Sequence, residues 1–285
     1  MSVIYCLVEA LITTVLAKQY NPEFCYRWGI ENMFFCSFYR VATLGSGSGV
    51  AAIIYLNEHG VEYSKGFGMY MLQYAFHKIS IAIYSAIFFF VSFGYMRGHF
   101  GGYTWLLLAG YAITMVITIA LILFCCSAKF HRLIFSILDF FNKKGKFDAV
   151  EMQLRAQCSD LEAASRYLLK KHKMVFAVIG LNIIKLCFWY GIPYLLFAGM
   201  GGINLVETMA ITALSVMLAA VIPTPAGIGS TEFVFTGLFA GIVGTGMAGS
   251  ASLLYRFATF VFPFLIGVVV VIIRSIREKR ALQDL

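Results

Sequence analysis

We consider first five ionisable residues that lie inside long apolar stretches of this sequence: Lys78, Lys185, Glu207, Glu232 and Arg256. A charge at the centre of a membrane helix costs at least ~2.5 kcal/mol, so each is expected to pair, to reach an interface or to face a wet cavity. Groups held in this way can bind a charged ligand or carry a proton inside a membrane. They are therefore the first candidates for function.

The strongest candidate pair is Glu232 with Arg256. Glu232 follows a loop by three residues, where Ser230 or Thr231 can cap a new helix and a carboxylate favours the positive end of the helix dipole. Arg256 has no such local role, and few carboxylates are available at its depth. We predict an ion pair that holds the loop against the last apolar helix; a capping acid at Glu232 is the alternative.

The other three charges have different settings. Lys185 lies near the middle of its apolar run, where reaching the surface is difficult, so we expect a cavity or a carboxylate partner; Glu232 with Lys185 could carry a proton. Lys78, next to His77, either faces an inner cavity or reaches a lipid phosphate, and the sequence leaves both open. Glu207 follows a GGIN turn and is expected at the outer interface.

Two clusters of backbone breakers interrupt apolar runs, GSGSG at 45–49 and PTPAGIG at 223–229. Neither can continue a helix, and unsatisfied backbone cannot face lipid, so each break is expected to be buried in protein or to line a cavity. Free N–H groups at such turns can hold an anion, of which a lipid phosphate is the obvious example. Arg40 could add a charge-assisted contact to that phosphate, or could lie at the interface. The lipid-path residues predicted from these turns are Gly45, Ser46, Gly47, Ser48 and Gly49 in the first and Pro223, Thr224, Pro225, Gly227 and Gly229 in the second.

Catalytic and metal-binding constellations are not evident. The five histidines are scattered singly and none of the seven cysteines forms a CxxC pair, so no metal site is expected. Paired carboxylates, a Ser/His/Asp set and a nucleotide-binding loop are also missing. We therefore expect no catalytic residue, no cofactor and no nucleic-acid partner, although a membrane enzyme acting on lipid headgroups stays an alternative.

The hydrophobic composition indicates which kind of secondary structure positions these residues. The chain has 285 residues, of which 60% are hydrophobic and 13% charged, with a mean hydropathy of +0.82, whereas soluble domains average about 25% charged residues. We predict an all-α polytopic membrane protein. Six apolar stretches are long enough to span, and two glycine-rich pieces at 32–57 and 230–246 are expected to form re-entrant hairpins. The expected spans are 1–19, 68–95, 103–127, 174–199, 205–222 and 250–273.

The distribution of charge predicts an orientation and a division of the single membrane domain 1–285. Residues 128–173 hold ten Lys/Arg and five Asp/Glu, and the positive-inside rule places this segment and the tail after 273 in the cytoplasm. The two halves, 1–127 and 174–285, then carry hairpins that enter from opposite faces, which is an inverted repeat with a site near the midplane. Within 128–173, helical spacing of apolar residues predicts an interfacial helix, followed by a second helix over about 149–171.

The run 221–235, VIPTPAGIGSTEFVF, resembles the lysylphosphatidylglycerol synthase transmembrane family, which includes the flippase-like half of the multiple peptide resistance factor. The stretch 43–80 resembles the family's other signature, except that Leu44 stands where the family usually has proline, and Arg256 matches a basic residue early in its last helix. Members of the family normally have an extra N-terminal helix, so the resemblance implies that this chain is one span short at its start. The aminoacyl-transferring members carry a soluble domain after the membrane part, for which a chain ending at Leu285 has no room.

The resemblance implies a lipid translocator in a bacterial cytoplasmic membrane, with a phospholipid as its substrate. The cargo class would be an aminoacylated phospholipid such as lysyl-phosphatidylglycerol, or a polyprenyl-linked or glycosylated lipid. Two alternatives stay open: the membrane component of a phosphatidylglycerol lysyltransferase activity, and a scaffold that recruits a separate lipid synthase through 128–173. A homo-oligomer is also possible.

Overall fold

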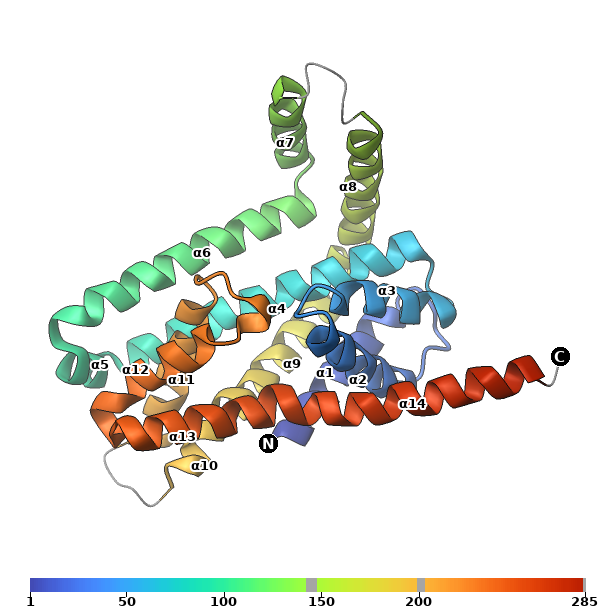
Figure 1. Ribbon diagram of the computed structural model, residues 1–285. Coiled ribbons are helices and arrows are strands. Elements are labelled where there is room, and N and C mark those ends of the chain that lie inside the picture. The colour runs from blue at the N-terminus through green and yellow to red at the C-terminus, as the bar shows by residue number, and fades with distance from the viewer. Residues whose placement is uncertain (142–147, 199–202, 284–285) are drawn as a thin grey trace.

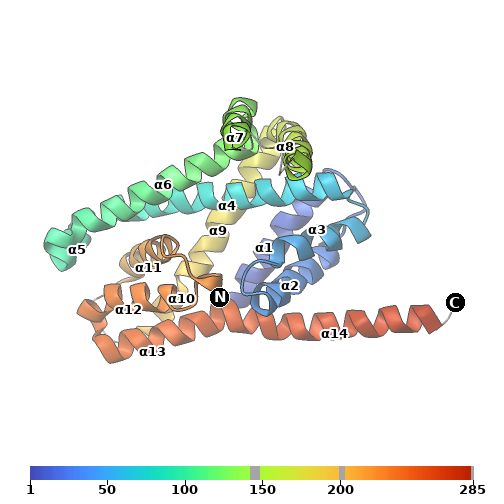
Figure 2. The same ribbon diagram turned by 45° about the horizontal axis from the view of Figure 1, so that its top comes forward.

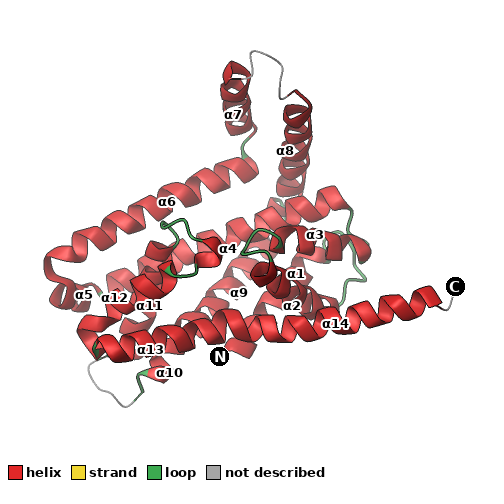
Figure 3. Cartoon of the chain, viewed as in Figure 1, coloured by secondary structure: helices red, strands yellow, loops and turns green. Residues whose placement is uncertain are grey.

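The computed structural model describes residues 1–141, 148–198 and 203–283, and within these ranges all regular secondary structure is helical (Figures 1 and 3). Five helical segments in these ranges are long and apolar enough to cross a membrane, the longest covering 245–280. The all-α polytopic membrane fold predicted from composition is confirmed.

The first half begins with α1 (Ser2–Ala17), followed by a helical hairpin and a long helix. The hairpin arms are α2 (Tyr26–Ala42) and α3 (Ser48–Glu58), and α4 (Tyr63–Val91) follows. The turn between the arms places Leu44 at φ +52° and Gly45 at φ +101°. Proline cannot adopt a positive φ, which gives a physical reason for leucine at position 44.

The second half repeats this order of elements. It contains α9 (His172–Tyr190), the short α10 (Ile192–Leu196), and a hairpin formed by α11 (Leu205–Ala219) and α12 (Ser230–Val243). The last long helix comprises α13 (Thr245–Arg256), a π-helical turn at Phe257–Val261, and α14 (Phe262–Gln283). α14 runs along one edge of the molecule to the C-terminus (Figures 1 and 2).

The two halves pack reciprocally. α1 lies against α9, α14 of the second half packs on α2 of the first, and α4 of the first half packs on α11 of the second. A Cβ at Gly267 would clash with the carbonyl of Phe34, so glycine is what allows α14 to approach α2 this closely. This reciprocal arrangement is the one that an inverted repeat predicts.

Between the halves, the chain adds an outer helix and a projecting pair. α5 (Phe93–Phe100) leads into α6 (Thr104–Cys126), and α7 (Ala128–Phe141) and α8 (Asp148–Leu169) extend away from the helix body (Figure 1). The two helices predicted within 128–173 are confirmed. Gly68 lets α4 and α8 approach closely, because a Cβ there would clash with Ala164.

Two of the stretches counted as long enough to span form shorter helices. α1 has 16 residues and α11 has 15. Residues 205–222 form one arm of the second hairpin, because α11 packs against α12 on the other side of the break at 223–229. The break predicted at 223–229 is therefore the turn of this hairpin.

Polar contacts tie the ends of several helices together beside α8. Asn21 Nδ2 donates to the His59 carbonyl at 2.8 Å, and Lys171 Nζ donates to Gln19 Oε1 at 2.9 Å. Met1, at the other end of α1, lies near Gly191 at the far end of α9. α1 and α9 are therefore antiparallel. The first hairpin starts at one end of the bundle and the second at the opposite end, as the charge distribution predicts.

Candidate functional site

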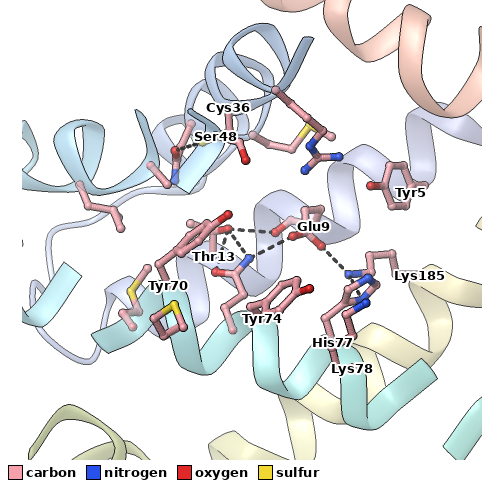
Figure 4. Close-up of a pocket in the computed structure, with 18 of the residues that line it drawn as sticks. Tyr5, Glu9, Thr13, Cys36, Ser48, Tyr70, Tyr74, His77, Lys78 and Lys185 are labelled. Atoms are coloured by element: carbon pink, nitrogen blue, oxygen red, sulfur yellow. Dashed lines mark hydrogen bonds and ion pairs between the residues drawn. The ribbon is translucent and has the colours of Figure 1, made fainter. Parts of the chain in front are cut away.

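A cavity of about 520 Å³ lies between α1, α2, α3, α4 and α9 (Figure 4). This volume is within the usual range for small-ligand pockets. Its wall combines apolar side chains with charged groups and several donors, and it includes the start of α3 at Ser48 and the turn residue Gly45. The polar and charged lining residues are Tyr5, Glu9, Thr13, Asn32, Arg40, Ser48, Tyr70, Gln73, Tyr74, His77, Lys78 and Lys185.

An ion pair between Glu9 and Lys185 forms one side of the cavity. Lys185 Nζ donates to Glu9 Oε2 at 2.6 Å and lies 3.1 Å from His77 Nδ1. The Lys185 side chain is 2% exposed, whereas that of Glu9 is 25% exposed. Glu9 is therefore the more accessible partner of the pair.

The second oxygen of Glu9 is held by α4. Gln73 Nε2 donates to Glu9 Oε1 at 3.1 Å and also to Thr13 Oγ1 at 3.1 Å. Both oxygens of the carboxylate are thus satisfied by fixed partners. The result is a rigid polar network that joins α1, α4 and α9 (Figure 4).

Helical spacing explains why these side chains meet. Glu9 and Thr13 are four residues apart on α1, and Gln73 and His77 are four apart on α4, so each pair shares a helix face. Because α1 packs on α9 and α4 packs on both, the two polar faces point into the same space.

Two further cations line the cavity. Arg40 interacts electrostatically with Glu9 and with the hydroxyls of Tyr5 and Tyr70, and Lys78 Nζ lies 5.3 Å from the centre of the Tyr74 ring. Within the described ranges, no carboxylate lies within 4.0 Å of either cation. The lining therefore has three full positive charges for one negative charge.

The second hairpin carries a separate charged cluster. Arg256 Nε donates to Glu232 Oε1 at 2.8 Å, while Glu232 Oε2 accepts from the Gly229 amide at 2.7 Å. Arg256 Nη2 also donates to the Ala226 carbonyl at 3.4 Å. The predicted ion pair is confirmed, and Glu232 in addition caps α12, so both interpretations of this residue are correct.

The turns of the two hairpins touch. A Cβ built on Gly45 would lie 3.4 Å from Cα and N of Ala226, so the backbones of the two turns are in contact. Ala226 has φ +54° and Gly227 has φ +71°, and such strained turns persist only where surrounding contacts fix them. Arg256 supplies one such contact. The first turn thus has the cavity on one of its faces and contacts the second turn with its other face.

A comparison of the sequence with protein families finds a match over most of the chain. The model of the lysylphosphatidylglycerol synthase TM region matches residues 1–267 of the chain. The chain belongs to this family. Comparisons with curated proteins and with solved structures each find no match.

The structure divides the residues predicted for a lipid path in this family member into two groups. The cavity is lined by Arg40, Gly45, Ser48, Lys78 and Lys185, so Lys78 faces the cavity. The remaining residues of the first turn lie beside it: Ser46 donates to the Thr43 carbonyl at 2.8 Å, Thr43 Oγ1 accepts from the Gly47 amide at 2.6 Å, and a Cβ at Gly49 would lie 2.9 Å from the Tyr70 ring.

The predicted residues of the second turn are not among those that line the cavity. Thr224 Oγ1 and Ser230 Oγ are 2.7 Å apart and satisfy one another. Pro225 starts a short 3-10 turn that ends at Gly227, and Gly229 is the N-cap of α12. Pro223 is exposed in the same turn. These residues shape the turn that contacts Gly45.

Lys185 has a different partner from the one considered for a proton relay. It pairs with Glu9, while Glu232 pairs with Arg256. Glu207 forms a capping box with Asn204 at the start of α11. Its place at the outer interface stays a prediction.

Sequence reasoning missed Glu9, Thr13 and Gln73. Glu9 is the carboxylate that Lys185 was predicted to need, and it lies in the middle of a stretch that was itself predicted to span. The signal was present in the spacing of Tyr5, Glu9 and Thr13, which places a polar stripe on an apolar helix.

Proposed function

We propose that the protein is a lipid translocator, which moves a phosphate-containing headgroup between leaflets while the acyl chains stay in the bilayer. The observation that supports this proposal is the cation-rich cavity inside a membrane domain, bordered by one re-entrant turn that contacts the other. Family membership adds a lipid-related context. Irregular backbone at membrane depth is tolerated where it lines such a cavity.

The cavity lowers the cost of crossing by replacing water around the headgroup. Arg40 and Lys78 offer positive charge to a phosphate, and the Ser48 hydroxyl and the N–H groups that open α3 offer hydrogen bonds. A phosphate bound by charge-assisted hydrogen bonds loses less free energy on leaving water than one in bare hydrocarbon. The apolar lining residues accept the glycerol and the first methylene groups.

The contact between the turns is the barrier in this proposal. With Gly45 against Ala226, the cavity is separated from the Glu232–Arg256 side of the protein. Translocation requires the two hairpins to separate and a new passage to open. Small residues at this contact keep the separation inexpensive, because little apolar area is exposed.

The experiment is leaflet exchange of headgroup-labelled phospholipids in proteoliposomes. Wild-type protein should exchange labelled phosphatidylglycerol faster than empty vesicles do. Arg40→Gln should reduce this exchange about tenfold, as expected for one lost charge-assisted contact. Arg27→Gln is the matched control, because Arg27 lies on the same helix with its side chain 73% exposed and outside the cavity.

Exchange that equals that of empty vesicles, from protein shown to be folded by circular dichroism, would refute translocation of that lipid. Equal losses in the Arg40 and Arg27 variants would instead refute the cavity as the path.

A further inference from the structure

We infer that the cavity selects a doubly negative phosphate group, a monoester or a diphosphate end, rather than a headgroup that carries a net positive charge. This inference rests on the proposed function for its lipid source and deepens it by naming the ligand chemistry. The ligand inferred here differs in charge from the cationic lysyl ester named in the family description.

One pair of charges in the cavity is already neutralised. Among the described residues, Glu9 is the one carboxylate in the lining, and it is bonded to Lys185 at 2.6 Å and to Gln73 at 3.1 Å. A ligand ammonium group that approached Glu9 would have to compete with Lys185, whose side chain is 2% exposed and is therefore held in place. The ion pair contributes no net charge to the cavity.

Two positive charges then remain. Arg40 and Lys78 both line the cavity, and neither has a carboxylate within 4.0 Å among the described residues. A phosphate monoester has a second ionisation near pH 6 and is close to doubly negative at pH 7. The net lining charge of two positive matches this charge, whereas a phosphodiester offsets only one of the two. Lysyl-phosphatidylglycerol also brings one phosphodiester charge, but its two ammonium groups place like charges in the same cavity.

The neutral lining favours the same ligand. Several hydroxyl donors surround the cavity, including Tyr5, Tyr70 and Ser48, and α3 starts there with the positive end of its dipole. A phosphate monoester accepts through three oxygens, and its lone pairs exceed those of a diester. The N–H groups at the start of α3 can only donate and so offer nothing to an ammonium group, whereas the hydroxyls can turn their protons toward phosphate oxygens.

The test is calorimetric titration of the detergent-purified full chain with three soluble lipids that share dioctanoyl tails. These are phosphatidic acid, phosphatidylglycerol and lysyl-phosphatidylglycerol. We expect phosphatidic acid to bind at least about tenfold more tightly than phosphatidylglycerol, corresponding to one additional charge-assisted interaction, and lysyl-phosphatidylglycerol to bind most weakly. Glycerol 3-phosphate is titrated in parallel to separate a lipid source from a soluble one.

Variants locate the binding to the cavity. Arg40→Gln and Lys78→Gln should each reduce the preference for phosphatidic acid over phosphatidylglycerol by about tenfold. Lys65→Gln is the matched control for Lys78→Gln, since Lys65 is on the same helix but pairs with Glu62 outside this cavity. The ranking of the three lipids by wild-type protein needs no variant, so it stays informative if a variant fails to fold.

Each outcome decides the inference separately from the proposed function. Binding of lysyl-phosphatidylglycerol as tight as that of phosphatidic acid would overturn the inference, and so would the absence of binding by every phosphate tested. Leaflet exchange of another lipid would still support translocation in either case. The expected ranking without leaflet exchange would uphold the ligand chemistry and refute translocation. Binding of glycerol 3-phosphate as tight as that of phosphatidic acid would uphold the phosphate and assign a soluble source.

Discussion

Replacing Glu9 by glutamine isolates the energetic role of its ion pair with Lys185. The substitution leaves the shape of the site unchanged but removes the single carboxylate that contacts the ammonium group. Because the Lys185 side chain is 2% exposed, the remaining charge stays away from water, next to His77 at 3.1 Å. The Lys185 ammonium group is then an uncompensated charge buried between α1 and α9.

The magnitude follows from the burial of the two partners. Removing one partner of a buried pair costs about 3–5 kcal/mol, and the 25% exposure of Glu9 places this pair toward the lower end. We expect a loss of about 3 kcal/mol, which is roughly a 150-fold change in the unfolding equilibrium. The double variant Glu9→Gln with Lys185→Met removes both charges and should lie within about 1 kcal/mol of the wild type.

The assay is equilibrium unfolding of purified protein in mixed micelles, followed by circular dichroism. Glu62→Gln is the control, because it breaks an ion pair with Lys65 in which the carboxylate is 70% exposed, and such pairs contribute about 0–1 kcal/mol. A double variant as unstable as Glu9→Gln alone would refute the reasoning. So would a single variant that loses no more stability than the Glu62 control.

Three further predictions concern the second hairpin and the turns. Exchanging the charges of Glu232 and Arg256 in one double variant should restore part of the lipid exchange that each single substitution abolishes, and a swap no better than either single variant would contradict the pairing. Gly45→Ala should lower the unfolding free energy by about 1–2 kcal/mol and should also slow lipid exchange, because its φ of +101° disfavours a Cβ. Gly246→Ala, with open space around it, should be near neutral in both measurements. Asn204→Ala should cost about 1 kcal/mol of unfolding free energy through loss of the capping box, with no change in lipid preference.

Much of the fold follows from length and composition of the apolar runs. A run that must cross about 30 Å of hydrocarbon has few alternatives to a helix, so 103–127 was predicted within one residue of α6 at both ends. The second hairpin follows from the helix breakers at 223–229 and from the charges that place both of its flanking helices. The length of its first arm was harder to predict, because 205–222 is apolar enough to span, and the packing of α11 on α12 shows that it is a hairpin arm.

The candidate site was predicted unevenly for a related reason. Glu232 and Arg256 were paired correctly because a loop of distinctive residues lies beside one of them, which narrows the choice of partner. Lys185 was recognised as needing a carboxylate, but the choice of Glu9 depends on α1 lying against α9, which are separated by more than 150 residues. Spacing within one helix indicates a polar face, and only tertiary packing says which faces meet.

The reciprocal packing of the halves also governs the order in which the protein can fold during synthesis. The close approach of α2 to its neighbour needs Gly267 in α14, a residue near the end of the chain. At ribosomal rates of about 5–20 residues per second, the first hairpin waits roughly 10–45 s for this surface. The turn, with Leu44 and Gly45 at positive φ, and the nearby charge of Arg40 must be kept from lipid during that interval. The nascent first half is therefore expected to depend on the insertion machinery longer than its own length requires.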